Sequence, residues 1–239
     1  MSSFALKIAA MLTMLIDHVG YTFQPQIPYS VYILCRTTGR LAMPLFCFMI
    51  AEGLFHTRDA KRYLARLAVF ALVSEVPFDL LFNNRITGSV TFLEYSRQNV
   101  GFTLFLGFLG ILLFDSFAAQ GRKGAALAAI LSAGAAAYLM RSDYTVYGVY
   151  YIFVFYYFRD KPWGRAAAFA GGVFMQAAGI LFTPFTSWHT ALYSLAAFLA
   201  VIPIGLYNGE RGRKGRAYLF YAFYPLHLLV LYAIKLAVG

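Results

Sequence analysis

Runs of mostly apolar residues, each about 20 long, follow one another along this chain and are separated by short polar stretches. A helix that crosses the hydrocarbon core of a bilayer needs about 20 such residues. We therefore predict about nine membrane-spanning helices, with a range of eight to ten because the sixth run is short and the fifth is built from Ala and Gly. The predicted spans are residues 4–23, 36–56, 62–82, 98–118, 124–141, 144–159, 163–182, 187–206 and 217–237.

The composition of the chain indicates the same class of protein, since 61% of the 239 residues are hydrophobic and only 13% are charged. Soluble domains carry about 25% charged residues, so a soluble enzyme is excluded. We predict an all-α polytopic helical bundle that forms a single transmembrane domain over residues 1–239. Cys35 and Cys47 have neither metal-ligand nor disulfide spacing, and we expect no metal site.

Basic residues gather in alternate connections between the predicted spans. The connections after the second, fourth, sixth and eighth spans hold Arg58, Lys61, Arg62, Arg66, Arg122, Lys123, Arg159, Lys161, Arg165, Arg211, Arg213, Lys214 and Arg216. Short loops rich in Lys and Arg remain in the cytoplasm. We therefore place the N-terminus in the cytoplasm and, with nine spans, the C-terminus outside the inner (cytoplasmic) membrane. The net charge of +10 then reflects topology and does not indicate nucleic-acid binding.

Asp17 and His18 lie next to each other inside the first apolar run, where an ionisable residue is costly and usually marks a site. Arg36 and Arg40 open the second run, four residues apart and so on one helical face. The predicted topology places all four in the outer half of the bilayer. We predict His18 as the central catalytic residue, with Asp17, Arg36 and Arg40 around it. The alternative for the arginines is that both side chains extend to the outer headgroups.

Glu75 and Asp79 lie one helical turn apart at the outer end of the third span, with Pro77 between them. Two carboxylates inside a membrane require counter-charges, and we expect Arg36 and Arg40 to supply them. We assign both acids to the catalytic site. A purely structural salt-bridge network is the alternative.

Polar residues at the outer ends of other spans are candidates for binding an acceptor. Gln98 and Asn99 begin the fourth span, and Asp143 and Tyr144 precede the sixth. His227 lies near the middle of the last span, so we expect it to pair with a residue of another span in either a structural or a functional role.

Two positions predict local helix geometry in the second span. Gly39 favours a close approach between helices, and Pro44 predicts a kink or a local break.

Basic loops on the cytoplasmic side, beneath a polar cluster in the outer half, favour an acyltransferase that uses an anionic donor. We predict that the phosphates of cytoplasmic acetyl-CoA bind to Arg58, Lys61, Arg62, Arg211, Arg213 and Lys214. The thioester would reach His18, which acts as a general base or carries the acyl group. An acceptor amine or hydroxyl would approach from outside. The alternative for these basic residues is a topology signal in contact with anionic lipid.

The chain also resembles the TraX family of membrane proteins, which are associated with acetylation of the conjugative pilin. The resemblance is carried in order by KIAAMLTMLIDHVG, RTTGRLAMPLFCFMIAEGLFHTRDAKRYLARL, SEVPFDLLF, QNVGFTL, DYTVYGV, YNGERGRKGR and FYPLHLL. That family is similar to the wider group of multi-spanning acyltransferases, which use a membrane-embedded His and cytoplasmic acyl-CoA. The resemblance implies that His18 is the catalytic His, with Asp17, Arg36 and Arg40 in support.

Three functions remain open at this point. The leading one is an acetyl-CoA-dependent acyltransferase whose acceptor is a pilin, a glycan or another outer molecule. The second is a small proton-coupled transporter or channel that uses Asp17, Glu75 and Asp79, although no repeated halves are visible in the sequence. The third is a membrane scaffold with a structural polar cluster. The predicted partners are membrane lipid, acyl-CoA and the acceptor, with no nucleic acid; an oligomer is left open.

Overall fold

The computed structural model describes residues 1–83, 92–93, 95–183, 188–212 and 217–238. Within these residues the fold is all-α, as predicted, and the only β-type pairing is an isolated bridge between Gln98 and Ser142. Helices are the expected solution for a chain in lipid, because each helix satisfies its own backbone hydrogen bonds. The chain forms two compact units that share helix α3 (Ala42–His56).

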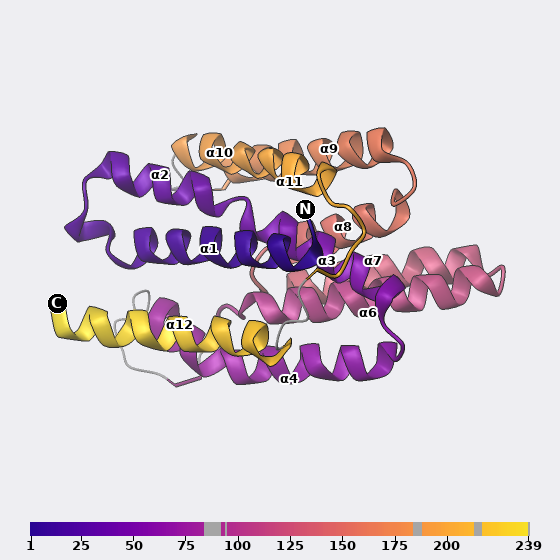
Figure 1. The fold of residues 1–239 in the computed structure, drawn as a ribbon, viewed down its shortest axis with the longest axis horizontal. Helices are drawn as coiled ribbons and strands as arrows, with labels where there is room; N and C mark the ends of the chain where they lie inside the picture. The colour runs from indigo at the N-terminus through magenta and orange to yellow at the C-terminus, as the bar shows by residue number, and fades with distance from the viewer. Residues whose placement is uncertain (84–91, 94, 184–187, 213–216, 239) are drawn as a thin grey trace. The chain divides into compact units, whose positions relative to one another are not determined.

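The first unit comprises Met1–Phe46 and Asp160–Gly239, so it joins the two ends of the chain. Within it, α1 and α2 form a helical hairpin, and α9, α10 and α11 follow one another along a second side (Figure 1). Its elements besides the first turn of α3 are α1 (Ser3–Thr22), η1 (Gln24–Gln26), α2 (Tyr29–Gly39), α9 (Pro162–Leu181), α10 (Trp188–Ser194), η3 (Leu195–Ala200), α11 (Val201–Gly205) and α12 (Ala217–Val238).

The second unit comprises Cys47–Arg159. Its elements are the rest of α3, α4 (Ala60–Phe78), the π-helical turn η2 (Asp79–Asn83), α6 (Val100–Ala119), α7 (Lys123–Leu139) and α8 (Thr145–Tyr157). Small residues let its helices pack closely. A Cβ atom on Gly107 would lie 2.3 Å from Cδ1 of Ile152, and one on Gly101 would lie 2.8 Å from Cα of Ala71.

Helical segments occupy each of the nine predicted spans, within the residues described. Five are long and apolar enough to cross a membrane, namely Ser3–Thr22, Tyr29–His56, Val100–Ala119, Trp188–Gly205 and Tyr218–Val238. Helices α7 and α8 are shorter, at 17 and 13 residues. The chain is thus a multi-pass membrane protein, and the count of nine spans stays a prediction.

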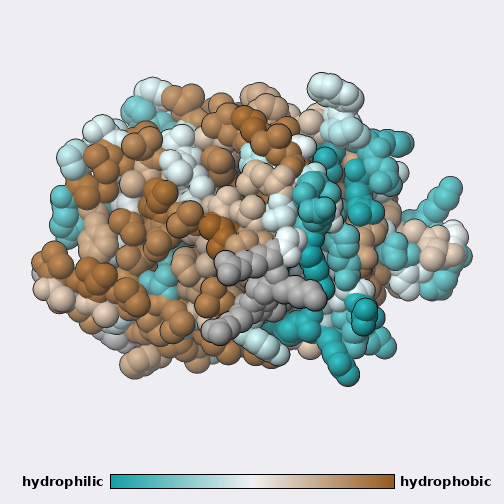
Figure 2. Space-filling model, viewed as in Figure 1, coloured by the Kyte–Doolittle hydropathy of each residue, from teal (hydrophilic) through white to brown (hydrophobic). Residues whose placement is uncertain are grey.

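The surface of the first unit agrees with lipid exposure. Figure 2 shows apolar residues spread over the visible side of α1 and α12. Leu12, Ile16, Leu226 and Val230 are among the exposed large apolar residues of these two helices. In water such surfaces would indicate a binding site, but in a membrane protein they are what the acyl chains contact.

The break in the second span lies at Arg40 and Leu41, between the end of α2 and the start of α3. We predicted a kink or break at Pro44, and the structure has the break a few residues earlier in the chain. Pro44 lies in the first turn of α3, where the missing N–H group has no helical partner to lose. The interruption is confirmed, and it places Arg40 at the C-cap of α2.

Candidate functional site

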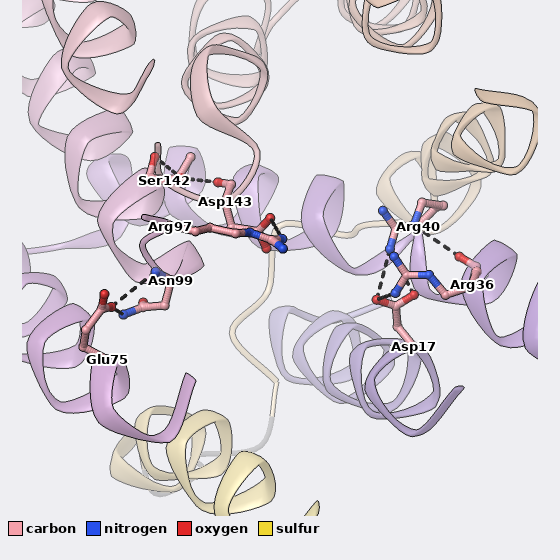
Figure 3. A network of polar contacts seen from close by, with 9 residues as sticks. Asp17, Arg36, Arg40, Glu75, Arg97, Asn99, Ser142 and Asp143 are labelled. Atoms are coloured by element: carbon pink, nitrogen blue, oxygen red, sulfur yellow. Dashed lines mark hydrogen bonds and ion pairs between the residues drawn. The ribbon is translucent and has the colours of Figure 1, made fainter. Parts of the chain in front are cut away.

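Asp17 of α1 lies between two guanidinium groups of α2 (Figure 3). Nη1 of Arg36 donates to Oδ2 at 2.7 Å, and Nη2 of Arg40 donates to both carboxylate oxygens at 3.0 Å. Nε of Arg40 also donates to the backbone oxygen of Arg36 at 3.2 Å, which joins the two arginines. Asp17 is only 8% exposed, so these contacts supply the compensation that a buried charge requires.

Glycines allow this ion-pair cluster to form. A Cβ atom on Gly39 would lie 2.2 Å from Cβ of Asp17, and one on Gly20 would lie 2.3 Å from Cβ of Cys35. Both distances are far below van der Waals contact, so only glycine lets α1 and α2 approach this closely. The close approach predicted at Gly39 is confirmed. It places the Asp17 carboxylate within hydrogen-bonding distance of the guanidiniums of Arg36 and Arg40.

One N–H group of this ion-pair cluster has no hydrogen-bond acceptor. Nε of Arg36 is buried and donates no hydrogen bond. The guanidinium of Arg36 lies 5.3 Å from the ring centre of Tyr21 and 6.0 Å from that of Tyr193. Aromatic faces favour a cation at such distances. The cluster therefore offers a buried cationic N–H group to a negatively charged atom.

His18 pairs with His227 of α12 across the first unit. Nδ1 of His18 lies 2.7 Å from Nε2 of His227. The ring planes differ by 6° and the ring centroids are 5.0 Å apart, so the imidazoles meet edge to edge in nearly one plane. His227 is 7% exposed. Our expectation that His227 pairs with another span is confirmed, and its partner is the predicted catalytic residue.

The hydrogen bonds of His227 determine where the protons lie on both rings. Nδ1 of His227 lies 2.8 Å from the backbone oxygen of Phe223, which can only accept, so this nitrogen carries the hydrogen. In neutral His227, Nε2 is then the acceptor, and Nδ1–H of His18 donates to it. The lone pair of neutral His18 is thereby placed on Nε2, which is the nitrogen that can take a proton.

The segment after α11 lies along the beginning of α1. The backbone N–H groups of Ser3 and Phe4 donate to the carbonyl oxygens of Glu210 and Arg211 at 2.8 Å and 3.2 Å. Arg211 therefore lies at the start of the helix that carries His18. Lys7 follows one turn later, with Nζ 5.1 Å from the ring centre of Phe220. Eleven residues separate Lys7 from His18, or about 16 Å of helix.

Glu75 of α4 contacts Asn99, the N-cap of α6. We expected Arg36 and Arg40 to be its counter-charges, but both pair with Asp17. Oε2 of Glu75 accepts hydrogen bonds from the backbone N–H and the side-chain amide of Asn99. Oε1 of Glu75 is buried and accepts none. The prediction of Arg36 and Arg40 as its partners failed because Asp17 lies opposite them on the adjacent helix.

Asp79 follows at the start of the π-helical turn η2 and is completely buried. Its backbone N–H group donates to the carbonyl oxygens of Glu75 and Val76. Pro77 lies inside α4 just before this turn, and a proline removes one helical hydrogen bond. The regular part of α4 thus ends just after this proline, and the π-helical turn that follows holds Asp79.

Asp143 and Tyr144 lie in the connection between α7 and α8. Nη2 of Arg97 donates to Oδ1 of Asp143 at 2.8 Å. Gln98 joins the same connection through its backbone, since its carbonyl oxygen accepts from the N–H group of Asp143 at 2.9 Å. The structure therefore brings Gln98, Asp143 and Tyr144 together, whereas the side chain of Asn99 binds to α4.

The predicted donor-binding residues are divided between the two units. Arg58, Lys61 and Arg62 lie exposed around the start of α4, where Nε of Arg62 is 3.1 Å from Oδ2 of Asp59. Arg211 is exposed in the first unit. Arg213 and Lys214 lie outside the described residues.

A separate ion-pair group lies at the end of α3. Glu52 accepts from Nε of Arg159 at 2.9 Å through Oε1, and Nε2 of His56 lies 3.3 Å from Oε2. Both oxygens of this carboxylate are thus engaged, which indicates a structural role. No cluster of three or more His, Cys, Asp or Glu side chains suited to a metal ion occurs in the part of the chain that the structure describes.

His227 and Tyr193 are the residues of the first unit that the sequence did not assign to the site. His227 was visible as an ionisable residue in an apolar run, but nothing in the sequence named its partner. Tyr193 carried no such signal, because tyrosines are common throughout this chain.

The model of the TraX protein family matches residues 2–235. The chain belongs to the TraX family. A probable fimbrial assembly protein, FimC (serogroup H1) of Dichelobacter nodosus, is 28% identical over an alignment of 247 residues, gaps included. The alignment covers 98% of this chain and 96% of the relative. An uncharacterized protein of Rickettsia prowazekii (strain Madrid E) is 27% identical over 93 residues, 39% of this chain and 34% of the relative. No solved structure matches.

Proposed function

We propose that this TraX protein is an integral membrane acyltransferase that transfers an acetyl group from cytoplasmic acetyl-CoA to an amine or hydroxyl on the outer side. The observation that carries the proposal is that consecutive residues of α1 make two polar contacts: His18 is hydrogen-bonded to His227 of α12, and Asp17 is ion-paired with Arg36 and Arg40 of α2. A general base needs a lone pair in a defined position, and a developing oxyanion needs buried donors. The first unit contains both.

The transfer step uses these groups in a balanced way. Nε2 of His18 takes the proton of the acceptor N–H or O–H as the nitrogen or oxygen attacks the thioester carbon. The new C–N or C–O bond forms, and the carbonyl oxygen becomes negative, a charge that the buried N–H of Arg36 would stabilise. The C–S bond then breaks, and the thiolate of CoA takes the proton from His18. The products are the acetylated acceptor and free CoA.

The location of Arg211 and Lys7 supports entry of the donor from the beginning of α1. Both cations lie at one end of the helix, and His18 lies about 16 Å further along it. The anionic phosphates of acetyl-CoA would bind at this cationic end, and the long thin arm of the donor would extend toward His18. In this proposal the N-terminus lies on the cytoplasmic side of the inner membrane.

The acceptor side of the proposal rests on the family and on the FimC relative, which is named as a fimbrial assembly protein. A pilin subunit is therefore the first acceptor to test, and a cell-surface glycan is the second. Gln98, Asp143 and Tyr144, which we predicted from the sequence as acceptor contacts, lie in the second unit and are given no part in the proposed transfer. Glu75 and Asp79 also lie in the second unit, and the proposed transfer assigns them no step.

The proton-coupled transporter is less well supported by the geometry. It requires Asp17, Glu75 and Asp79 to exchange protons or bind a cationic solute. Both oxygens of Asp17 already accept hydrogen bonds from guanidiniums, so this carboxylate serves to hold Arg36 and Arg40 in position.

The test of the proposed function is acetyl-CoA turnover by the purified protein in lipid nanodiscs. We expect saturable binding of acetyl-CoA, release of free CoA thiol and transfer of radiolabelled acetyl to a pilin-derived acceptor. The thioether analogue of acetyl-CoA, which cannot donate its acyl group, should bind without releasing thiol. A folded sample that neither binds acetyl-CoA nor releases CoA would exclude the acyltransferase.

Replacing Arg211, Arg213 and Lys214 together with Gln is expected to raise the KM for acetyl-CoA about tenfold with little change in kcat, because the lost contacts act on the bound donor in ground and transition state alike. The measurement is the initial rate of CoA release as acetyl-CoA is varied. The control variant replaces Arg122 and Lys123, which lie in another basic loop, with Gln. It should leave the KM for acetyl-CoA unchanged. An unchanged KM in the triple variant would make this segment a topology signal only.

A further inference from the structure

A pocket of about 580 Å³ lies in the second unit, at the end of α7 and the connection to α8. Its lining includes Arg97, Tyr138, Leu139, Arg141 and Tyr144. Ligand-binding pockets are commonly about 300–1,000 Å³, so the space is sufficient for a small polar group. Nothing in the acyl-transfer chemistry of His18 uses this pocket.

The connection that forms the pocket is held in an unusual backbone conformation. Arg141, Tyr144 and Thr145 have φ values of 52°, 63° and 40°, and they are the non-glycine residues with positive φ in the described part of the chain. Such residues persist only where the surroundings enforce them, and they concentrate at binding sites.

Buried hydrogen bonds supply this enforcement. The hydroxyl of Thr103 donates to Oγ of Ser142 at 2.9 Å, and the backbone N–H of Ser142 donates to the oxygen of Ala137 at 3.1 Å. Gln98 adds the bridge to Ser142. The connection is therefore rigid, and it presents Arg141 to the pocket without the cost of ordering a mobile loop.

The charge of the pocket favours an anion. Arg97 and Asp143 neutralise each other through their ion pair at 2.8 Å. The guanidinium of Arg141 makes no ion pair or hydrogen bond among the described residues. The pocket thus carries one uncompensated positive charge, and guanidinium groups suit phosphate oxygens particularly well.

An apolar surface leads along α7 to this pocket. Leu131 is 62% exposed, Tyr138 66% and Leu139 78%, and Leu127 lies one turn before Leu131 on the same face. This apolar surface of α7 would contribute nothing to the binding of a soluble anion. An acyl chain would lie along it while the headgroup occupies the pocket, which is how basic pockets of membrane proteins recognise anionic lipids.

We propose that this pocket binds the phosphate of an anionic phospholipid headgroup on Arg141, with an acyl chain along the exposed face of α7. The site lies entirely within the second unit and is independent of the proposed acyl transfer. Tyr138 and Tyr144 line the headgroup space, and an aromatic residue with a polar tip is favoured at the interface between lipid and water.

The test compares lipid binding by the purified full-length protein in detergent, measured by native mass spectrometry with dioleoyl phosphatidylglycerol or dioleoyl phosphatidylcholine. We expect phosphatidylglycerol to bind with clear preference, and the variant Arg141→Gln to weaken its binding about tenfold or more through loss of a charge-assisted contact. Arg122→Gln is the matched control, since it removes an arginine at the opposite end of α7, and it should bind like the wild type. Arg141→Lys should retain part of the preference.

Three results would overturn the proposal. The first is equal binding of phosphatidylglycerol by the wild type and Arg141→Gln. The second is equal binding of the two lipids by the wild type. The third is binding of glycerol 3-phosphate alone as tight as that of phosphatidylglycerol, which would make the ligand a soluble phosphate. Circular dichroism and size-exclusion chromatography of each variant verify that it is folded. Because no acyl donor is present, the result does not depend on the acyltransferase proposal.

Discussion

The variant His18→Ala is expected to slow acyl transfer by about 10²- to 10⁴-fold, the range that a positioned general base contributes. The structural reason is the hydrogen-bond chain from the backbone oxygen of Phe223 through His227 to His18. This chain places the proton-accepting lone pair on Nε2 of His18. The measurement is kcat/KM for release of CoA, with binding of the thioether analogue as the check that the donor site is intact.

Two further histidine variants sharpen this test. His189→Ala removes an imidazole of α10 that stacks on Trp188 at a centroid distance of 3.7 Å, and it should retain full activity. His227→Gln keeps a polar side chain but loses the aligned ring, so we expect an intermediate loss with a changed pH profile. Turnover at the wild-type rate in folded His18→Ala would remove His18 from the mechanism.

The variant Gly39→Ala is expected to destabilise the protein by about 3 kcal/mol or more, at the upper end of what overpacking costs. Its new Cβ atom would lie 2.2 Å from Cβ of Asp17. Because a Cβ atom cannot move without its backbone, α1 and α2 must separate. The separation also draws Asp17 away from Arg36 and Arg40, which leaves buried charges with weakened partners. Thermal unfolding in detergent, followed by circular dichroism, measures the loss.

Gly171→Ala is the matched control in the same unit. Gly171 lies inside α9, and a Cβ atom there would meet nothing within 4 Å. Alanine is favoured over glycine inside a helix by about 0.5–1 kcal/mol, so this variant should be as stable as the wild type or more stable. A Gly39→Ala protein that unfolds at the wild-type temperature would contradict the close packing of α1 on α2.

The residues of the candidate site were identifiable from the sequence because membranes make polar residues conspicuous. Asp17, His18 and His227 each interrupt an apolar run, and the cost of placing an ionisable group in lipid does not depend on the fold. The positions of the helices followed for the same reason, since about 20 apolar residues are what a span requires. The break near Arg40 was shifted from the expected Pro44, because a proline is accommodated in the first turn of a helix.

The partners of these residues were decided by the tertiary structure. Arg36 and Arg40 were expected to neutralise Glu75 and Asp79, but they bind Asp17 because Gly20 and Gly39 let α1 and α2 meet closely. The pairing of His18 with His227, 209 residues later in the chain, depends on α1 and α12 packing side by side.

The sequence drew attention to Asp143 and Tyr144, but it did not predict the pocket they line with Arg141, since this pocket depends on left-handed backbone at residues that are not glycine. Sequence alone thus determined the membrane class, the helices and the unusual polar residues, because transfer into lipid is a property of local segments. Only the tertiary structure decided which polar groups meet and which nitrogen of His18 can take a proton, because these depend on contacts between helices distant in sequence.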